Sequence, residues 1–359
     1  MEAVLNVVVF LVGAAMVAGT VGSAVRTVIL PRGVPAKLAS VVFVTIRRAF
    51  DLRVKRIKDY EGRDRVFALY GPLALLLLAT TWLLIALVGY AAMHWGLGAY
   101  PVREAFTLSG SSLLTLGFDR PPDLPKVALS FTEAGVGLFL VALLISYLPS
   151  LYSSFSRREA MVTLLEVRAG SPPSGVEMIE RYQLIHDLAE LDDAWENWEQ
   201  WFVELEETHT CQPALVFFRS PQPDHSWVTA AGAVLDGAAL YLASSPDEHP
   251  KADLCLRAGY LAFRRIADFF AIPYDPSPDP DGPITGARDE FDAAYDRLKE
   301  AGVPLKDDRD EAWKAFGGWR VNYDAVLVTL AALVMAPYAR WSSDRSNRYR
   351  VRALRGRRP

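Results

Sequence analysis

The chain has little cysteine and little histidine, with two and five residues among 359. Two cysteines form at most one disulfide, which excludes a secreted protein built on a disulfide framework. His209 and Cys211 lie close together, but the other cysteine, Cys255, is distant, so the spacing does not fit zinc. No Gly-x-Gly-x-x-Gly motif and no nucleophile signature occurs. We therefore expect no enzymatic activity, no cofactor and no resident metal.

A large basic region is also missing, since the formal net charge is −4 and basic runs lie only beside apolar stretches or at the C-terminus. This distribution argues against nucleic acid as a partner. Residues 171–339 carry 13 Lys and Arg against 30 Asp and Glu, whereas the last twenty residues carry eight Arg and one Asp. The charge is therefore segregated along the chain, which is unusual for a one-domain soluble enzyme.

Charge is nearly absent from three long stretches. Ala3–Val25 and Val66–Trp95 contain no Lys, Arg, Asp or Glu, and Val127–Ser156 contains only Glu133. Each is longer than the about 20 apolar residues that cross a bilayer. We predict three transmembrane helices. A cleaved signal peptide is the alternative for the first stretch, but its first charge is Glu2 and no basic region precedes it, which favours a retained helix.

Lys and Arg residues indicate the orientation in the membrane. Residues 32–65 hold ten of them, residues 96–126 hold three, and two more follow the third stretch directly. The positive-inside rule places residues 32–65 and everything after residue 157 in the cytoplasm, with the N-terminus outside. We expect a multi-pass protein of the plasma membrane. Ala36–Phe50 is apolar enough for an interfacial helix, and a plain connector is the alternative.

The segment between the second and third stretches is not an ordinary polar loop. Pro101 and Glu104 are typical of a helix start, and an apolar run continues to Leu114. The run is too short to cross a bilayer and fits a re-entrant helix. The residues after it would then form non-helical backbone at membrane depth, which is tolerated only beside protein or a watery cavity.

The sequence after this helix resembles the selectivity filter of the potassium-channel pore family, Thr-x-Gly-Tyr/Phe-Gly-Asp. The five positions are Thr115, Leu116, Gly117, Phe118 and Asp119. The resemblance covers roughly residues 66–156 and departs from the family because the second filter glycine is missing. The segment is also similar to filters of Trk/Ktr-type potassium transporters, which carry four repeats in one chain. The resemblance implies a homotetramer that conducts potassium or another monovalent cation.

Three further positions in the third stretch are candidates for roles in the pore. Glu133 is an acid inside a predicted span, and we expect it to support the filter from behind. A carboxylate solvated near the outer interface is the alternative. Gly135 and Gly137 are possible bending points and Pro149 can kink the cytoplasmic end, which are the features of a gate.

The remainder has the periodicity of an all-α domain. Gly170–Gly175 reads as a linker. Helices are predicted at Met178–Glu207, Trp227–Ser244, Leu254–Ala271, Ala287–Ala301 and Ala325–Met335. The aromatic stripe of Trp195, Trp198 and Trp201 is typical of a core. The partner or ligand of this domain is not indicated by any motif.

The predicted fold is an α-helical membrane protein with three transmembrane helices, a re-entrant pore helix and an all-α cytoplasmic domain. Its parts are an N-terminal span (1–31), a basic segment (32–65), a pore module (66–156), a helix extension and linker (157–175), an acidic helical domain (176–340) and an Arg-rich tail (341–359). A tetrameric, potassium-channel-like cation channel in the lipid bilayer is the functional prediction. The main alternative is a membrane-anchored interaction or sensor protein with a vestigial loop, and a membrane enzyme is a weaker one.

Overall fold

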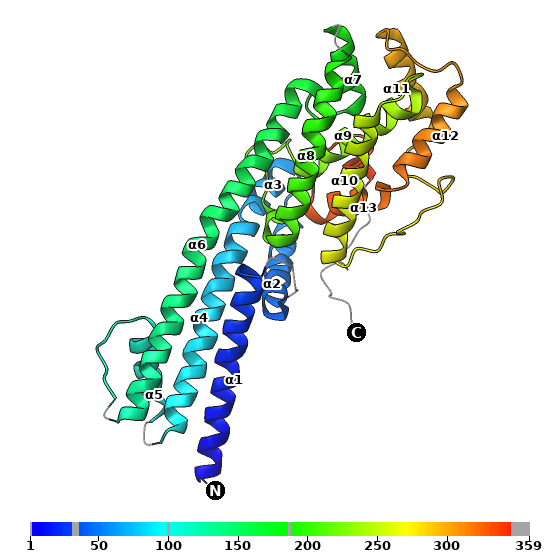
Figure 1. Cartoon of the computed structure of the whole chain (residues 1–359). Coiled ribbons are helices and arrows are strands. Elements are labelled where there is room, and N and C mark those ends of the chain that lie inside the picture. Colours follow the sequence, from blue (N-terminus) through cyan, green and yellow to red (C-terminus); the bar gives the residue numbers. More distant parts are fainter. Residues whose placement is uncertain (1, 31–35, 99–100, 122, 186–187, 346–359) are drawn as a thin grey trace. The chain divides into compact units, whose positions relative to one another are not determined.

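The computed structural model describes residues 2–30, 36–98, 101–121, 123–185 and 188–345, and these residues form helices and no strand (Figure 1). Their contacts divide the chain into two compact units. Unit 1 comprises the residues up to Leu52 together with Tyr70–Ser153, and unit 2 comprises Arg53–Leu69 together with the residues from Ser154 onward. Most of the predicted Arg-rich tail, residues 346–359, lies outside the described part.

Four helical stretches are long and apolar enough to cross a membrane. They are α1 (Glu2–Val28), α3 with α4 (Tyr60–Gly96), α6 (Leu124–Ala169) and α9 (Trp227–Ser244). The fold is all-α, and by length and composition these four candidate spans suggest a multi-pass membrane protein. The four differ in their surroundings, because 11% of the most apolar window of α1 is buried against 94% of that of α9. Helix α9 thus satisfies its apolar surface within the protein itself.

Unit 1 is built on α1, α4 (Tyr70–Gly96) and the first part of α6, with α2 (Lys37–Val54) beside them. Its shared core consists of Ala24, Leu78, Trp82, Ala86, Leu113, Leu140 and Leu143. The indole Nε1 of Trp82 donates to Ser23 Oγ at 3.2 Å, which ties α4 to α1. Phe43 of α2 packs on this core, and its carbonyl accepts from Tyr70 at 3.1 Å. The segment predicted as an interfacial helix or connector is therefore helical and packed.

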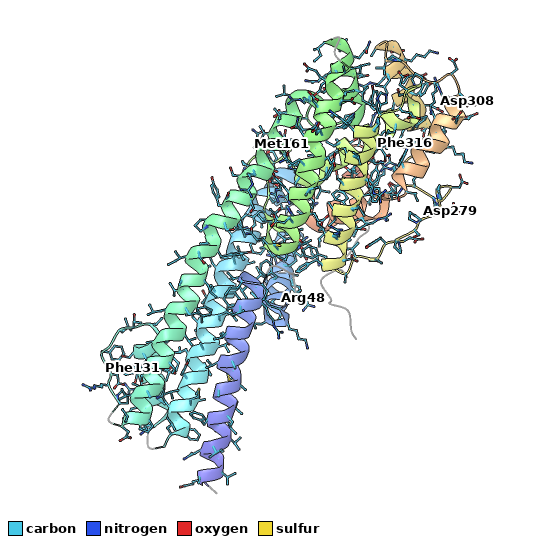
Figure 2. The ribbon with its side chains drawn as sticks, viewed as in Figure 1. Arg48, Phe131, Met161, Asp279, Asp308 and Phe316 are labelled. Carbon is cyan, nitrogen blue, oxygen red and sulfur yellow. The ribbon has the colours of Figure 1, made fainter. Side chains whose placement is uncertain are left out.

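The outside of unit 1 is apolar. Leu5 and Leu11 on α1, Leu84 on α4 and Ile145 on α6 are all exposed. Phe131, labelled in Figure 2, is 73% exposed on α6. Many exposed large apolar side chains are unfavourable in water, and they are expected where a helix contacts lipid or partner chains.

The boundaries between units differ from the predicted segment boundaries. Helix α3 (Tyr60–Ala68) belongs to unit 2, so the basic segment 32–65 is divided between the two units. Helix α6 passes from unit 1 to unit 2 after Ser153 without interruption. The predicted linker at 170–175 is a tight turn, because Ser174 already caps the next helix by accepting from the Glu177 N–H.

Unit 2 wraps its helices around α9. Its other elements are α7 (Gly175–Leu184), α8 (Glu190–Cys211), η1 (Pro213–Phe217), α10 (Pro250–Phe269), α11 (Arg288–Glu300), α12 (Arg309–Arg320), α13 (Asp324–Val334) and η2 (Ser343–Arg345). Helices α7, α10, α12 and α13 contact α9. The predicted tryptophan stripe on α8 is buried, with Trp195 fully enclosed, which confirms its place in the core.

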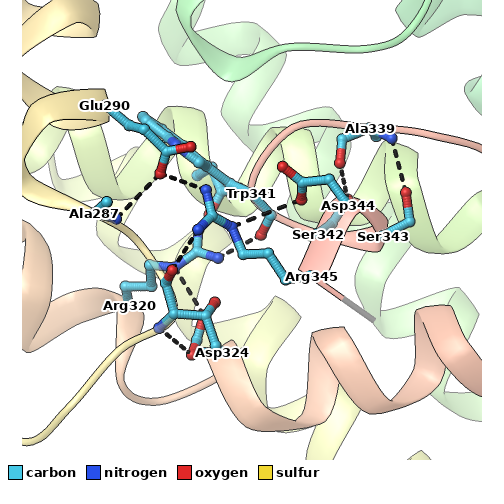
Figure 3. A network of polar contacts seen from close by, with 12 residues as sticks. Ala287, Glu290, Arg320, Asp324, Ala339, Trp341, Ser342, Ser343, Asp344 and Arg345 are labelled. Atoms are coloured by element: carbon cyan, nitrogen blue, oxygen red, sulfur yellow. Dashed lines mark hydrogen bonds and ion pairs between the residues drawn. The ribbon is translucent and has the colours of Figure 1, made fainter. Parts of the chain in front are cut away.

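A buried ionic network holds α9 to the C-terminal part of unit 2. Arg320, at the end of α12, is fully buried and pairs with Asp236 of α9 and with Asp324 at 2.9 Å. Its guanidinium also donates to the carbonyl of Trp341. Figure 3 shows Arg320 between Asp324 and Trp341, with Arg345 nearby. Removing one partner of such a buried pair costs about 3–5 kcal/mol, because the other charge is left uncompensated.

A second buried polar cluster joins α8 to α6. The His209 ring Nδ1 lies 2.9 Å from the carbonyl of Leu205, which can only accept, so Nδ1 carries the proton. Nε2 accepts from Arg158 of α6 at 3.2 Å. Burial, and then the positive charge of Arg158, lower the pKa of His209 well below 6.5. The imidazole is therefore neutral in the folded protein.

This histidine predicts an acid-sensitive fold. Below pH 6.5 the unfolded chain binds a proton at His209 that the folded chain does not, so stability falls as the pH falls. The expected slope from this group is about 1.4 kcal/mol per pH unit below about pH 6. Thermal unfolding of the full chain in detergent, followed by tryptophan fluorescence between pH 5 and 8, measures it. His209→Gln should lose that part of the slope, and an unchanged slope would contradict the assignment.

Candidate functional site

The predicted short helix between the second and third stretches is present as α5 (Val102–Leu113). It begins directly after Pro101, and Glu104 lies in its first turn. Ala105, Leu108 and Ser109 are buried on its inner face, and it packs against α4. At 12 residues it is too short to cross a bilayer, so the chain must turn back at its end.

The five filter-like residues form a non-helical loop that folds back on the end of α5. The N–H groups of Leu116 and Gly117 both donate to the carbonyl of Ser111, at 2.8 and 3.3 Å. The N–H of Asp119 donates to the hydroxyl of the same serine at 3.1 Å. Ser111 is itself buried. One serine of the helix thus collects three backbone donors and fixes the path of the loop.

The carbonyl oxygens of this loop, unlike most of its N–H groups, have no hydrogen-bond partners within the described part of the chain. Among the described residues, the carbonyls of Thr115, Leu116, Gly117 and Phe118 accept no hydrogen bond. The side chains of Leu116 and Phe118 are 60% and 68% exposed in the single chain. Within the described residues, the loop therefore has backbone oxygens without hydrogen-bond donors and apolar side chains that are not buried.

The loop backbone is strained. Gly117 has φ +72°, the left-handed conformation expected of it, and Thr115 has φ +56°. Left-handed backbone is a genuine outlier for a β-branched residue such as threonine. Strain of this kind persists only where the surrounding structure imposes it, and it clusters at functional sites.

Glu133 of α6 lies in a buried cluster formed with residues of α4 and α5. Its carboxyl group contacts the hydroxyl of Ser109 on α5, and its Oε2 lies 3.1 Å from Nε2 of His94 on α4. Ser109 Oγ also lies 2.8 Å from the carbonyl of Leu87. Glu133 and His94 are both 0% exposed. The alternative of a solvated carboxylate is therefore wrong, and the acid contacts the helix that carries the loop rather than the loop itself.

The three predicted gate positions behave differently. A Cβ on Gly137 would lie 2.1 Å from the carbonyl oxygen of Leu113, so this glycine allows α6 to pass against the end of α5. A Cβ on Gly135 would meet nothing within 4 Å. Pro149 lies inside the continuous helix α6. Close packing, rather than bending, accounts for Gly137 in this structure.

A groove of about 370 Å³ opens in unit 2 between α6, α7 and α8. Met161, labelled in Figure 2, lines it together with Leu164, Leu165, Arg168, Tyr182, Glu190, Asp193, Ala194, Asn197 and Trp198. Its charged groups are engaged, since Arg168 donates to the Tyr182 hydroxyl at 3.0 Å and Asp193 pairs with Lys251. Within the described residues, no three His, Cys, Asp or Glu side chains are grouped to hold a metal.

Sequence reasoning missed Ser111 and His94. The run Ser109-Gly-Ser-Ser inside a mostly apolar helix was the available signal for the serine, because buried hydroxyls need partners. His94, at the end of a charge-free stretch, gave no such signal. The chain matches no family model, and no curated protein or solved structure is similar to it.

Proposed function

We propose that the protein is a tetrameric, potassium-channel-like cation channel of the plasma membrane. In this proposal α1, α4 and the first part of α6 cross the bilayer, α5 is a re-entrant pore helix, and unit 2 is cytoplasmic with α9 as its buried centre. The excess of Lys and Arg in residues 32–65 supports that orientation. Thr115–Asp119 forms the selectivity filter.

The unpaired carbonyls of the loop carry the proposal. A cation filter replaces the hydration shell of the ion with backbone oxygens, so those oxygens must be free and their peptide N–H groups must be bonded elsewhere. Ser111 takes three of the four N–H groups concerned, those of Leu116, Gly117 and Asp119, and the carbonyls of Thr115–Phe118 accept no bond within the described residues. Asp119 at the mouth concentrates cations.

A single chain cannot form this pore. It contributes one loop, and one loop does not surround an ion. The exposed Leu116 and Phe118 side chains support an assembly in which neighbouring chains cover them. Four copies around an axis give a ring of loops lined by carbonyls, with Glu133 and Gly137 fixing each pore helix from behind.

Cation flux into liposomes and the mass of the assembly test this function. We expect purified protein to conduct monovalent cations, and the detergent-solubilised particle to have four times the chain mass of 39.7 kDa. A monomer or dimer under mild conditions, or liposomes without flux, would contradict the channel and favour a vestigial loop in an anchored sensor. Paired measurements with K⁺ and Na⁺ establish the selectivity that remains with one filter glycine missing.

A further inference from the structure

Arg158 of α6 binds the backbone of a short segment of unit 2, at Leu215 and Phe218. Arg158 is 4% exposed and donates from Nη1 to the carbonyl of Leu215 at 2.8 Å and from Nη2 to that of Phe218 at 2.7 Å. Its Nε donates to Glu159 at 2.8 Å, which compensates the buried charge. Both carbonyls belong to η1 or the residue after it. The end of η1 is therefore fixed to α6.

Arg219, which follows Phe218 in the sequence, binds α3 through its side chain. Its guanidinium pairs with the carboxylate of Asp64, and Nη2 donates to the Tyr60 hydroxyl at 2.6 Å. It also donates to the carbonyls of Val334 at 2.7 Å and Met335 at 2.9 Å. Those carbonyls end α13, where a helix lacks internal donors and favours a cation. Arg219 thus joins α3 to the C-terminus of α13.

The two arginine contacts are one residue apart. Arg158 holds the carbonyl of Phe218, and the side chain of Arg219 holds Asp64. Any displacement of this backbone moves both contacts together. Helix α3 leads into α4 through Leu69 alone, and α6 is one helix from Leu124 to Ala169. The helix that directly precedes α4 in the chain and the unit 2 part of α6 are thereby both bonded to one short segment of unit 2.

We infer that Leu215–Arg219, here called the coupling segment, transmits the conformation of unit 2 to both α4 and α6 and so sets the conductance of the pore. This inference rests on the proposed channel function. Separating the partners of such a buried network leaves a charge uncompensated, which is strongly disfavoured, so the elements that it joins are expected to move together. A change in unit 2 that shifts the coupling segment acts on α4 through Asp64 and Tyr60 and on α6 through Arg158.

Asp64→Asn is the sharpest variant, because it removes the charge that holds α3 while Arg219 keeps its bonds to the end of α13. Tyr60→Phe is a milder second variant that deletes one hydroxyl partner. Glu180→Gln is the matched control, since the Glu180–Arg297 ion pair joins α7 to α11 and involves no predicted membrane helix. All are made in the full chain in liposomes, with two readouts, cation flux and amide hydrogen exchange of residues 60–68.

We expect Asp64→Asn to speed hydrogen exchange in α3 at least tenfold, to leave exchange in α9 unchanged, and to change flux severalfold. Tyr60→Phe should act in the same direction with a smaller effect, and Glu180→Gln should match the wild type in both readouts. A wild type without flux overturns the channel function itself. A conducting wild type with unchanged flux in Asp64→Asn despite faster α3 exchange overturns the coupling inference, and so does unchanged α3 exchange.

Discussion

Replacing Gly117 by valine is expected to reduce cation flux to background while expression and membrane insertion stay near those of the wild type. Gly117 has φ +72°, and a β-branched residue there must either leave the left-handed region or carry strain. A Cβ at this position meets nothing within 4 Å, so the effect comes from the backbone alone. In a tetramer the strain of about 1–2 kcal/mol or more is imposed in each of four loops.

Leu116→Val is the control for this substitution, because it places the same side chain one residue earlier, where φ is not positive. It should retain most of the flux. Asp119→Asn should lower conductance mainly at low ionic strength, where the lost charge is least screened. If the wild type conducts and Gly117→Val conducts equally well, Thr115–Asp119 is not the filter.

Replacing Gly137 by alanine is expected to reduce flux at least tenfold and to destabilise the protein by about 1–3 kcal/mol. The new methyl group would lie 2.1 Å from the carbonyl oxygen and 3.1 Å from the carbonyl carbon of Leu113. Backbone cannot yield as a flexible side chain does, so the end of α5 must move. The filter-like loop begins at Thr115, two residues after Leu113, so we expect the displacement of Leu113 to alter the loop as well.

Gly135→Ala is the matched control on the same helix, because its Cβ enters open space. It should conduct normally and gain about 0.4–1 kcal/mol in stability from reduced freedom of the unfolded chain. Flux in liposomes and thermal unfolding in detergent measure both variants. Equal losses of flux at the two positions, without loss of stability, would instead support the bending role predicted from sequence.

The long helices were predictable because their signal is local. Absence of charge over more than 20 residues located α1, α4 and α6, and the predicted Trp227–Ser244 matches α9 residue for residue. Periodicity of aromatic residues placed Trp195 in the core. Helix α12 was not predicted, because it is polar and carries Gly317 and Gly318 near its end. Local sequence patterns therefore predict helices that are strongly apolar or periodic, and they miss polar helices such as α12.

The long-range polar contacts of the candidate site and of the coupling segment were not predictable in the same way. Asp64 and Arg219 are 155 residues apart, and His94 and Glu133 are 39 apart, so no spacing rule joins them. Glu133 could be singled out because an acid inside an apolar span is rare. Its partners depend on how three helices pack. Gly137 was predicted as a bending point, whereas the structure shows a close approach to the end of α5, and sequence alone cannot distinguish the two.

The buried pair of Asp236 and Arg320 has a consequence for how the chain is synthesised. Helix α9 is apolar enough to enter a bilayer, but Asp236 lies at its middle, where an acid opposes insertion by about 2.5–3.5 kcal/mol. Arg320 follows 84 residues later, which is about 4–17 s at ordinary translation rates. In the proposed channel, with unit 2 in the cytoplasm, the unpaired carboxylate would oppose entry of this apolar segment into the bilayer during that interval. Once Arg320 has emerged, the same carboxylate anchors that segment inside the finished domain.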